Sequence, residues 1–169
     1  MMCADDRALM SRSQPARLPS VLATWFGCGL SPRAPGTVGS LGAVPLHLLL
    51  RETPGVVHAA AIALLLAAGT WAAHRYASDR GESDPQRVVI DEVAGTLLAL
   101  GCVRHERAWL QVLAFLLFRL LDIWKPGPIR RAEHLPPAGL GIMADDILAG
   151  LCAGALAFAL TLALPQLTR

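Results

Sequence analysis

Charged residues are scarce in this chain of 169 residues: Asp, Glu, Lys and Arg make up 17%, while apolar residues make up 54%. Soluble domains usually carry about 25% charged residues, so the composition favours a membrane protein. The formal net charge is only +2, which gives no reason to expect a nucleic-acid partner. The length corresponds to about one domain.

Cysteine motifs and an apolar leader are also lacking. The four cysteines form no Cys-x-x-Cys pair, so neither a disulfide framework nor a zinc site is expected. The five histidines are scattered, and we expect them at the surface or at helix ends. Residues 1–19 carry several charges without an apolar stretch, so they do not resemble a signal peptide. We expect a polar, disordered tail over 1–19 and a single domain over 20–169.

The alternation of apolar and polar residues that marks β-strands is absent, and the apolar residues instead form long runs. These runs cover 41–50, 56–73, 88–103, 109–124 and 147–164. We therefore predict an all-α, membrane-embedded bundle of about four to five apolar helices. The uncharged run 147–164 fits a membrane helix best. Four glycines inside the runs should let helices approach closely: Gly95, Gly101, Gly150 and Gly154.

Two segments rich in glycine and proline, Gly27–Ser40 and Lys125–Ala144, are predicted to be loops. Between the last two apolar runs lies a segment with unusual charges. Arg119, Asp122 and Lys125 are spaced three apart, which places them on one side of a helix. Two cations around a carboxylate suit an anionic substrate held beside a metal. An ion pair at a helix end explains the same residues without a site.

Two further pairs of acids adjoin apolar runs. Asp91-Glu92 precedes Val93, and Asp145-Asp146 precedes Ile147. Helix capping is the simpler interpretation, because Asp is favoured at the start of a helix. However, charges at the ends of membrane helices are costly unless they serve a site.

The direction of the apolar segments helps to decide between helix capping and a functional site. If the five apolar segments alternate in direction, all the acid pairs, Asp122 and the Gly27–Ser40 segment lie on one face of the membrane. The polar site is therefore predicted at one end of the bundle. All Lys and Arg residues also fall on that face, except Arg51, Arg104, Arg107 and Arg169. Because positive charge marks the cytoplasmic side, the site should face the cytoplasm.

The converging residues suit phosphate chemistry with a hard cation. Asp91, Glu92, Asp122, Asp145 and Asp146 supply oxygen ligands for Mg²⁺ and are the candidate catalytic and metal-binding residues. Arg33, Arg119, Lys125 and Arg130 are candidates for neutralising phosphate charge. Thr37 and Ser40 belong to a loop that could offer backbone N–H groups to phosphate. That loop lacks the Gly-Lys-Ser/Thr ending of a P-loop.

Four motifs follow one another along the chain: Gly27-x-Gly-Leu-Ser-Pro-x-x-Pro-Gly-Thr-x-Gly-Ser-Leu41, Asp91-Glu92, Phe118-Arg-x-x-Asp-x-x-Lys-Pro-x-Pro-Ile129 and Gly139-x-Gly-Ile-Met-x-Asp-Asp-Ile-x-Ala-Gly150. In this order they resemble the motifs of the bacterial phosphatidylglycerophosphatase A family. The resemblance implies a Mg²⁺-dependent phosphatase of the inner membrane that converts phosphatidylglycerophosphate to phosphatidylglycerol. No motif acid is missing, and the resemblance implies a metal-centred role for all five.

Two alternatives of other classes remain at this stage. One is a soluble helical Mg²⁺ phosphohydrolase that acts on a small phosphate ester. The other is a non-catalytic membrane subunit whose acids only cap helices. Detergent-free solubility would favour the first alternative, and absence of Mg²⁺-dependent phosphate release would favour the second.

Overall fold

Residues 17–164 are described by the structure, which is a computed structural model. Every regular element in this range is a helix, which confirms the predicted class. The helices are α2 (Arg17–Ala23), the 3₁₀ turn η1 (Cys28–Leu30), α3 (Pro35–Gly42), α4 (Val44–Leu50), α5 (Gly55–Arg80), α6 (Ile90–Cys102), α7 (Ala108–Trp124), α8 (Gly127–Ala132) and α9 (Ala138–Ala163). The tail predicted over 1–19 lies outside the described residues, except for residues 17–19, which begin α2.

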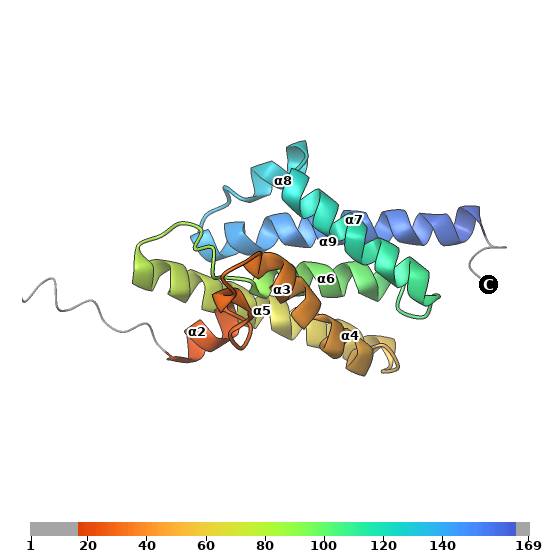
Figure 1. The fold of residues 1–169 in the computed structure, drawn as a ribbon, viewed down its shortest axis with the longest axis horizontal. Coiled ribbons are helices and arrows are strands. Elements are labelled where there is room, and N and C mark those ends of the chain that lie inside the picture. Colours follow the sequence, from red (N-terminus) through yellow and green to blue (C-terminus); the bar gives the residue numbers. More distant parts are fainter. Residues whose placement is uncertain (1–16, 165–169) are drawn as a thin grey trace, which may run out of the picture.

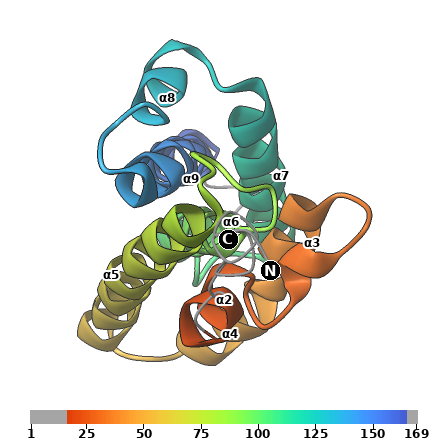
Figure 2. The same cartoon turned by 90° about the vertical axis from the view of Figure 1, so that its left-hand side faces the viewer.

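Helix α6 lies at the centre, with the other long helices around it (Figures 1 and 2). Its buried side chains, such as Val93 and Leu97, contact helices on several sides. The closest packing is against α9, because a Cβ atom at Gly150 would collide with the backbone oxygen of Gly95. A Cβ atom at Gly154 would likewise lie 2.7 Å from the Cys102 sulfur. The predicted role of these small residues in helix packing is confirmed.

Gly150→Leu should therefore destabilise the fold, because the added side chain has no space between α6 and α9. Overpacking of a tight core usually costs about 1–3 kcal/mol. Gly127→Leu is the matched control, because nothing lies within 4 Å of a Cβ atom at that position. Thermal unfolding of both variants in the same detergent measures the difference. An equal loss of stability in the two variants would contradict this account of the helix packing.

Two helices are long and apolar enough to cross a membrane. Helices α5 and α9 have 26 residues each and a mean hydropathy of 1.9. At about 1.5 Å per residue each spans about 39 Å, more than the bilayer core of about 30 Å. Helices α6 and α7, with 13 and 17 residues, are shorter. The predicted total of four to five membrane helices therefore stays a prediction.

The outer face of α7 supports the membrane assignment. Val112, Leu116 and Leu120 recur every four residues and are each 57% exposed. Tryptophans stand near both ends of this stripe, with Trp109 and Trp124 at 43% and 72% exposure. A continuous apolar face of this kind is typical of contact with lipid, and aromatic residues at its ends are typical of the membrane interface.

The loop predicted over Gly27–Ser40 is partly wrong. Residues Pro35 onward form helix α3, and η1 lies before it. Pro35 is compatible with the first turn of a helix, because its ring pre-sets the backbone angle and the missing N–H has no intrahelical role there. Two glycines of this segment are used for close contact: Gly36 packs against Glu92, and Gly39 packs against Val89. Gly27, with φ 97°, does serve a turn, directly before η1.

The loop predicted over Lys125–Ala144 is also shorter than expected. Helix α8 forms within it, and α9 begins at Ala138. Asp145 and Asp146 consequently lie two turns inside α9 and not at its start. Helix capping therefore does not explain this pair of acids.

Two histidines lie at helix ends, as expected, but are buried: His47 is in the last turn of α4 and His58 in the first turn of α5. His47 and His58 are 1% and 6% exposed. The Nε2 atom of His47 lies 3.2 Å from Gln111 Oε1, which joins α4 to α7. His47, which lies in an apolar stretch of the sequence, is thus a core residue with a polar partner.

Candidate active site

A cavity of about 660 Å³ lies where the predicted site residues meet. Five segments line it: the start of α3, the loop before α6, the first turn of α6, the end of α7, and the segment from Glu133 into α9. All five predicted acids line this cavity. The structure therefore confirms that the polar site lies at one end of the bundle, as the alternation of segment directions predicted.

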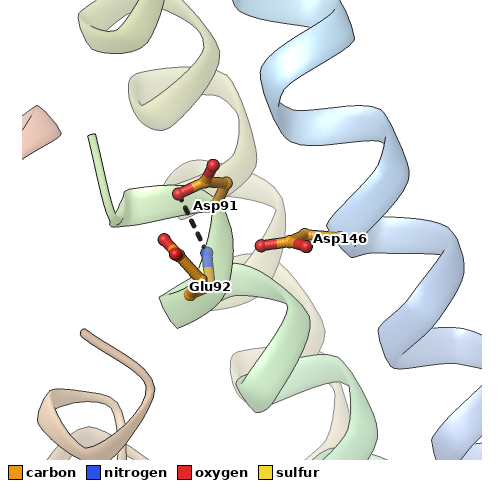
Figure 3. A group of neighbouring side chains, drawn as sticks. All are labelled: Asp91, Glu92 and Asp146. Carbon is orange, nitrogen blue, oxygen red and sulfur yellow. Dashed lines mark hydrogen bonds between the residues drawn. The ribbon is translucent and has the colours of Figure 1, made fainter. Parts of the chain in front are cut away.

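Three of the acids form what we term the three-acid cluster: Asp91, Glu92 and Asp146 (Figure 3). One carboxylate oxygen from each lies within 4.8 Å of those of the other two. Within residues 17–164, Glu92 Oε2 is buried and has no hydrogen-bond partner. Three close carboxylates with an unpartnered oxygen would repel one another without a cation, and hard oxygen ligands suit Mg²⁺. The cluster therefore fits the expected metal.

The packing of α6 on α9 sets the separation of these acids. Gly95 follows Asp91 by four residues, and Gly150 follows Asp146 by four, so each glycine lies one turn along the same helix face. Because the two backbones touch at these glycines, Asp146 of α9 is brought beside the first turn of α6. The small residues thus position the cluster as well as stabilise the core.

The other two predicted acids are each paired with a cation. Asp122 Oδ2 accepts a bond of 2.7 Å from Arg119 Nη1. Asp145 Oδ2 accepts a bond of 2.6 Å from Lys125 Nζ. In this arrangement Asp122 and Asp145 neutralise and orient cations at the edge of the cluster. A direct metal-binding role for them stays a prediction.

Lys125 reaches Asp145 because of its backbone conformation. It follows α7 with φ 45°, in the left-handed region, directly before Pro126. Its ammonium group also donates to Glu133 Oε2 at 3.2 Å, and so joins α8 and α9 to the end of α7. Partial burial alone would lower the pKa of Lys125, but the bonds to Asp145 and Glu133 outweigh it and raise the pKa. Lys125 is therefore a permanently charged group in the cavity wall.

Ser40 positions Arg119 through a hydrogen bond. Arg119 Nη1 donates to Ser40 Oγ at 3.1 Å, and the Ser40 hydroxyl donates to the carbonyl oxygen of Gly36 at 3.0 Å. Ser40 is fully buried, so its hydroxyl does not face the cavity. Ser40 is one of the six residues predicted to bind phosphate. In the structure it positions the guanidinium group of Arg119 instead.

The remaining candidates for phosphate binding are dispersed. Lys125 lines the cavity, whereas Arg33, Thr37 and Arg130 are exposed and lie outside its lining. Sequence reasoning missed Glu133, the second partner of Lys125. No helical spacing could have found it, because α8 and its flanking turns separate the two residues.

The fold and this site together define a helical membrane protein with a cluster of acids and cations at one end of the bundle. The family model described as Phosphatidylglycerophosphatase A matches residues 21–161. The chain belongs to this family, which confirms the resemblance seen in the motifs. It is therefore an enzyme of the hydrolase class, a phosphatase, and the alternative of a non-catalytic subunit is set aside.

Three relatives extend this result. The chain is 42% identical to Phosphatidylglycerophosphatase A of Escherichia coli (strain K12), over 82% of this chain and 81% of that protein. It is 37% identical to the Haemophilus influenzae protein of the same name, over 83% and 86% of the two chains. It is also 42% identical to a Bacteroides thetaiotaomicron protein named "Putative phosphatidylinositol-3-phosphatase", over 82% and 90%. No solved structure matches the chain.

Proposed function

We propose that this protein hydrolyses phosphatidylglycerophosphate to phosphatidylglycerol and phosphate in a Mg²⁺-dependent reaction, as a step of phospholipid synthesis. The observation that carries the proposal is the three-acid cluster beside Lys125, at the end of an apolar bundle that belongs to this family. Two relatives are named for this activity.

The residues divide into three roles. Asp91, Glu92 and Asp146 would hold the metal. Bound Mg²⁺ supplies charge that polarises a phosphoryl oxygen and acidifies a coordinated water. Lys125 and Arg119, kept in place by Asp145 and Asp122, neutralise the phosphate of the substrate.

The position of the cavity fits a lipid better than a small soluble ester. The apolar stripe on α7 runs towards Trp124, one residue before Lys125 of the cavity wall. A lipid whose acyl chains lie along this face in the bilayer can place its head group at the end of the helix. The head group of such a lipid then lies close to the cavity.

Phosphate release by purified protein in proteoliposomes tests this function. We expect rapid release from phosphatidylglycerophosphate with Mg²⁺, and slow release from glycerol 3-phosphate, which has the same phosphate ester without acyl chains. Phosphatidylinositol 3-phosphate should be compared, because one relative carries that name. Faster release from the inositol lipid would overturn the proposed substrate, and faster release from glycerol 3-phosphate would favour the small-ester alternative.

We also propose a multi-pass location in the bacterial inner membrane with the active site facing the cytoplasm. Single cysteines at Ser83, in the loop at the site, and at His105, in the turn between α6 and α7, test the orientation. In cells lacking the native cysteines, a membrane-impermeant thiol reagent should label position 105 but reach position 83 only after permeabilisation. The reverse pattern would contradict the orientation, and protection of both positions would contradict a crossing by α6.

A further inference from the structure

The turn after α2 holds two aromatic residues in the left-handed region of the backbone. Trp25 and Phe26 have φ values of 46° and 54°. Helix α2 ends there in a Schellman motif, in which Phe26 N–H donates to Val21 O at 2.8 Å and Trp25 N–H donates to Leu22 O at 3.0 Å. The Trp25 position of this motif usually carries glycine, because L side chains are disfavoured in that conformation. The turn is therefore strained, and strain of this kind points to a functional requirement.

The strained turn directs the two aromatic rings differently. Trp25 packs inward, and its Nε1 donates to the carbonyl oxygen of Gly42 at 3.0 Å. Phe26 points outward and is 72% exposed. Leu18, Val21 and Leu30 are exposed near it, at 62%, 44% and 60%. We term these four side chains, Leu18, Val21, Phe26 and Leu30, the outer patch.

A groove of about 450 Å³ runs between the outer patch and α5. Val21, Phe26 and Leu30 form its apolar wall, and Tyr76 and Arg80 of α5 complete it. The Arg80 guanidinium lies over the Tyr76 ring, 4.4 Å from its centroid. An apolar surface with a fixed cation at its edge is the combination that favours binding to anionic membranes.

The charges around the outer patch are mainly positive. Arg17 and Arg33 are exposed on the flanking segments. Within residues 17–164, neither these two residues nor Arg80 forms an ion pair. Two acids, Glu82 and Asp84, line a separate hollow that Arg80 also borders. Among residues 17–164, no ion pair therefore competes with lipid phosphates for these three cations.

The outer patch is attached to the segment that leads into the three-acid cluster. Helix α2 packs on the C-terminal half of α5, at the end of the bundle that holds the active site (Figure 1). Val89 N–H donates to the carbonyl oxygen of Ala23 at 2.9 Å. Gly29 packs so closely on Arg87 that a Cβ atom would collide with its carbonyl oxygen. The turn is thus joined to Arg87 and Val89, in the segment that leads directly into α6.

We propose that the outer patch docks on the anionic phospholipid surface of the leaflet on the active-site side. Phe26 and Leu30 enter the interface between head groups and acyl chains, while Arg80, Arg17 and Arg33 contact lipid phosphates. This contact fixes the depth of the three-acid cluster relative to the head groups. The strain at Trp25 and Phe26 is the cost of presenting an aromatic ring to lipid.

Fluorescence quenching by doxyl-labelled lipids tests the contact directly. An environment-sensitive dye on a single cysteine is placed at Phe26, at Val112 in the exposed α7 stripe, and at the exposed Ser83, in protein without native cysteines. In vesicles containing phosphatidylglycerol, we expect quenching at position 26 to be at least threefold that at 83 and similar to that at 112. Equal quenching at 26 and 83 would overturn the proposal. No turnover is required, so the result is independent of the proposed substrate.

A second variant separates docking from folding. Phe26→Asn should not harm the fold, because Asn tolerates the left-handed region better than an aromatic residue. With the dye at Leu30, this change should halve the quenching or more, while the unfolding temperature stays equal or rises. The conservative Phe26→Leu change should keep most of the quenching. Unchanged quenching in Phe26→Asn would overturn the proposal.

Discussion

Asp146→Asn should reduce the rate of phosphate release a hundredfold or more, while the protein stays folded. The change keeps the shape of the side chain but removes a negative charge from the three-acid cluster. Loss of one electrostatic group in an active site typically costs about 3 kcal/mol of transition-state stabilisation. Asp91→Asn and Glu92→Gln should have effects of the same order. Steady-state phosphate release in proteoliposomes measures all three variants.

The unfolding temperature of Asp146→Asn distinguishes a metal-binding role of Asp146 from a purely structural role. Because the three carboxylates repel one another, neutralising Asp146 should leave the unfolding temperature in EDTA unchanged or higher. The rise in unfolding temperature on addition of Mg²⁺ should shrink, because a ligand has been lost. Asp79→Asn is the matched control, since Asp79 lies on α5 outside the cavity lining. A near-normal rate in Asp146→Asn would contradict the metal-centred mechanism.

The convergence of the acids could be predicted from the sequence because it depends only on where apolar runs begin and end. Asp91 lies near the start of the run 88–103, Asp122 lies near the end of the run 109–124, and Asp146 directly precedes the run 147–164. Alternation of direction then places them at one end without any knowledge of packing. The all-helical class follows from the same runs and the absence of strand periodicity.

The grouping within the site could not be predicted, because it depends on contacts between helices. Sequence spacing treats Arg119, Asp122 and Lys125 as neighbours on one face. In the structure Lys125 leaves that face because its backbone turns into the left-handed region before Pro126. It binds Asp145 and Glu133 instead. Residues that end a helix therefore cannot be placed by helical periodicity alone.

The role of Ser40 could not be predicted from the sequence either. In the sequence it belongs to a segment rich in glycine and proline, which predicts a loop with exposed polar groups. In the structure the glycines of that segment allow α3 to pack against α6, and Ser40 is buried where its hydroxyl meets Arg119. Glycine marks either a flexible turn or a close approach, and the composition of the segment does not distinguish between them.

Removal of divalent cations should abolish activity, and Mg²⁺ should restore it. Seven acids line the cavity, including the five predicted site acids. Among these seven, Asp122 pairs with Arg119, and Asp145 and Glu133 pair with Lys125. Within the described residues, no ion pair reaches Asp91, Glu92 or Asp146. These three carboxylates therefore need a cation before an anionic phosphate can approach them.

The experiment compares phosphate release in excess EDTA with release after Mg²⁺ is returned above the chelator concentration. The unfolding temperature should rise with Mg²⁺ in the wild type, because an ion that binds only the folded state stabilises it by mass action. The same titration in Asp146→Asn should need a higher Mg²⁺ concentration for any effect, whereas Asp79→Asn should behave as the wild type does. Full activity in EDTA would rule out the metal mechanism. Loss of activity without any Mg²⁺-dependent change in stability would place the ion on the substrate instead of on the three-acid cluster.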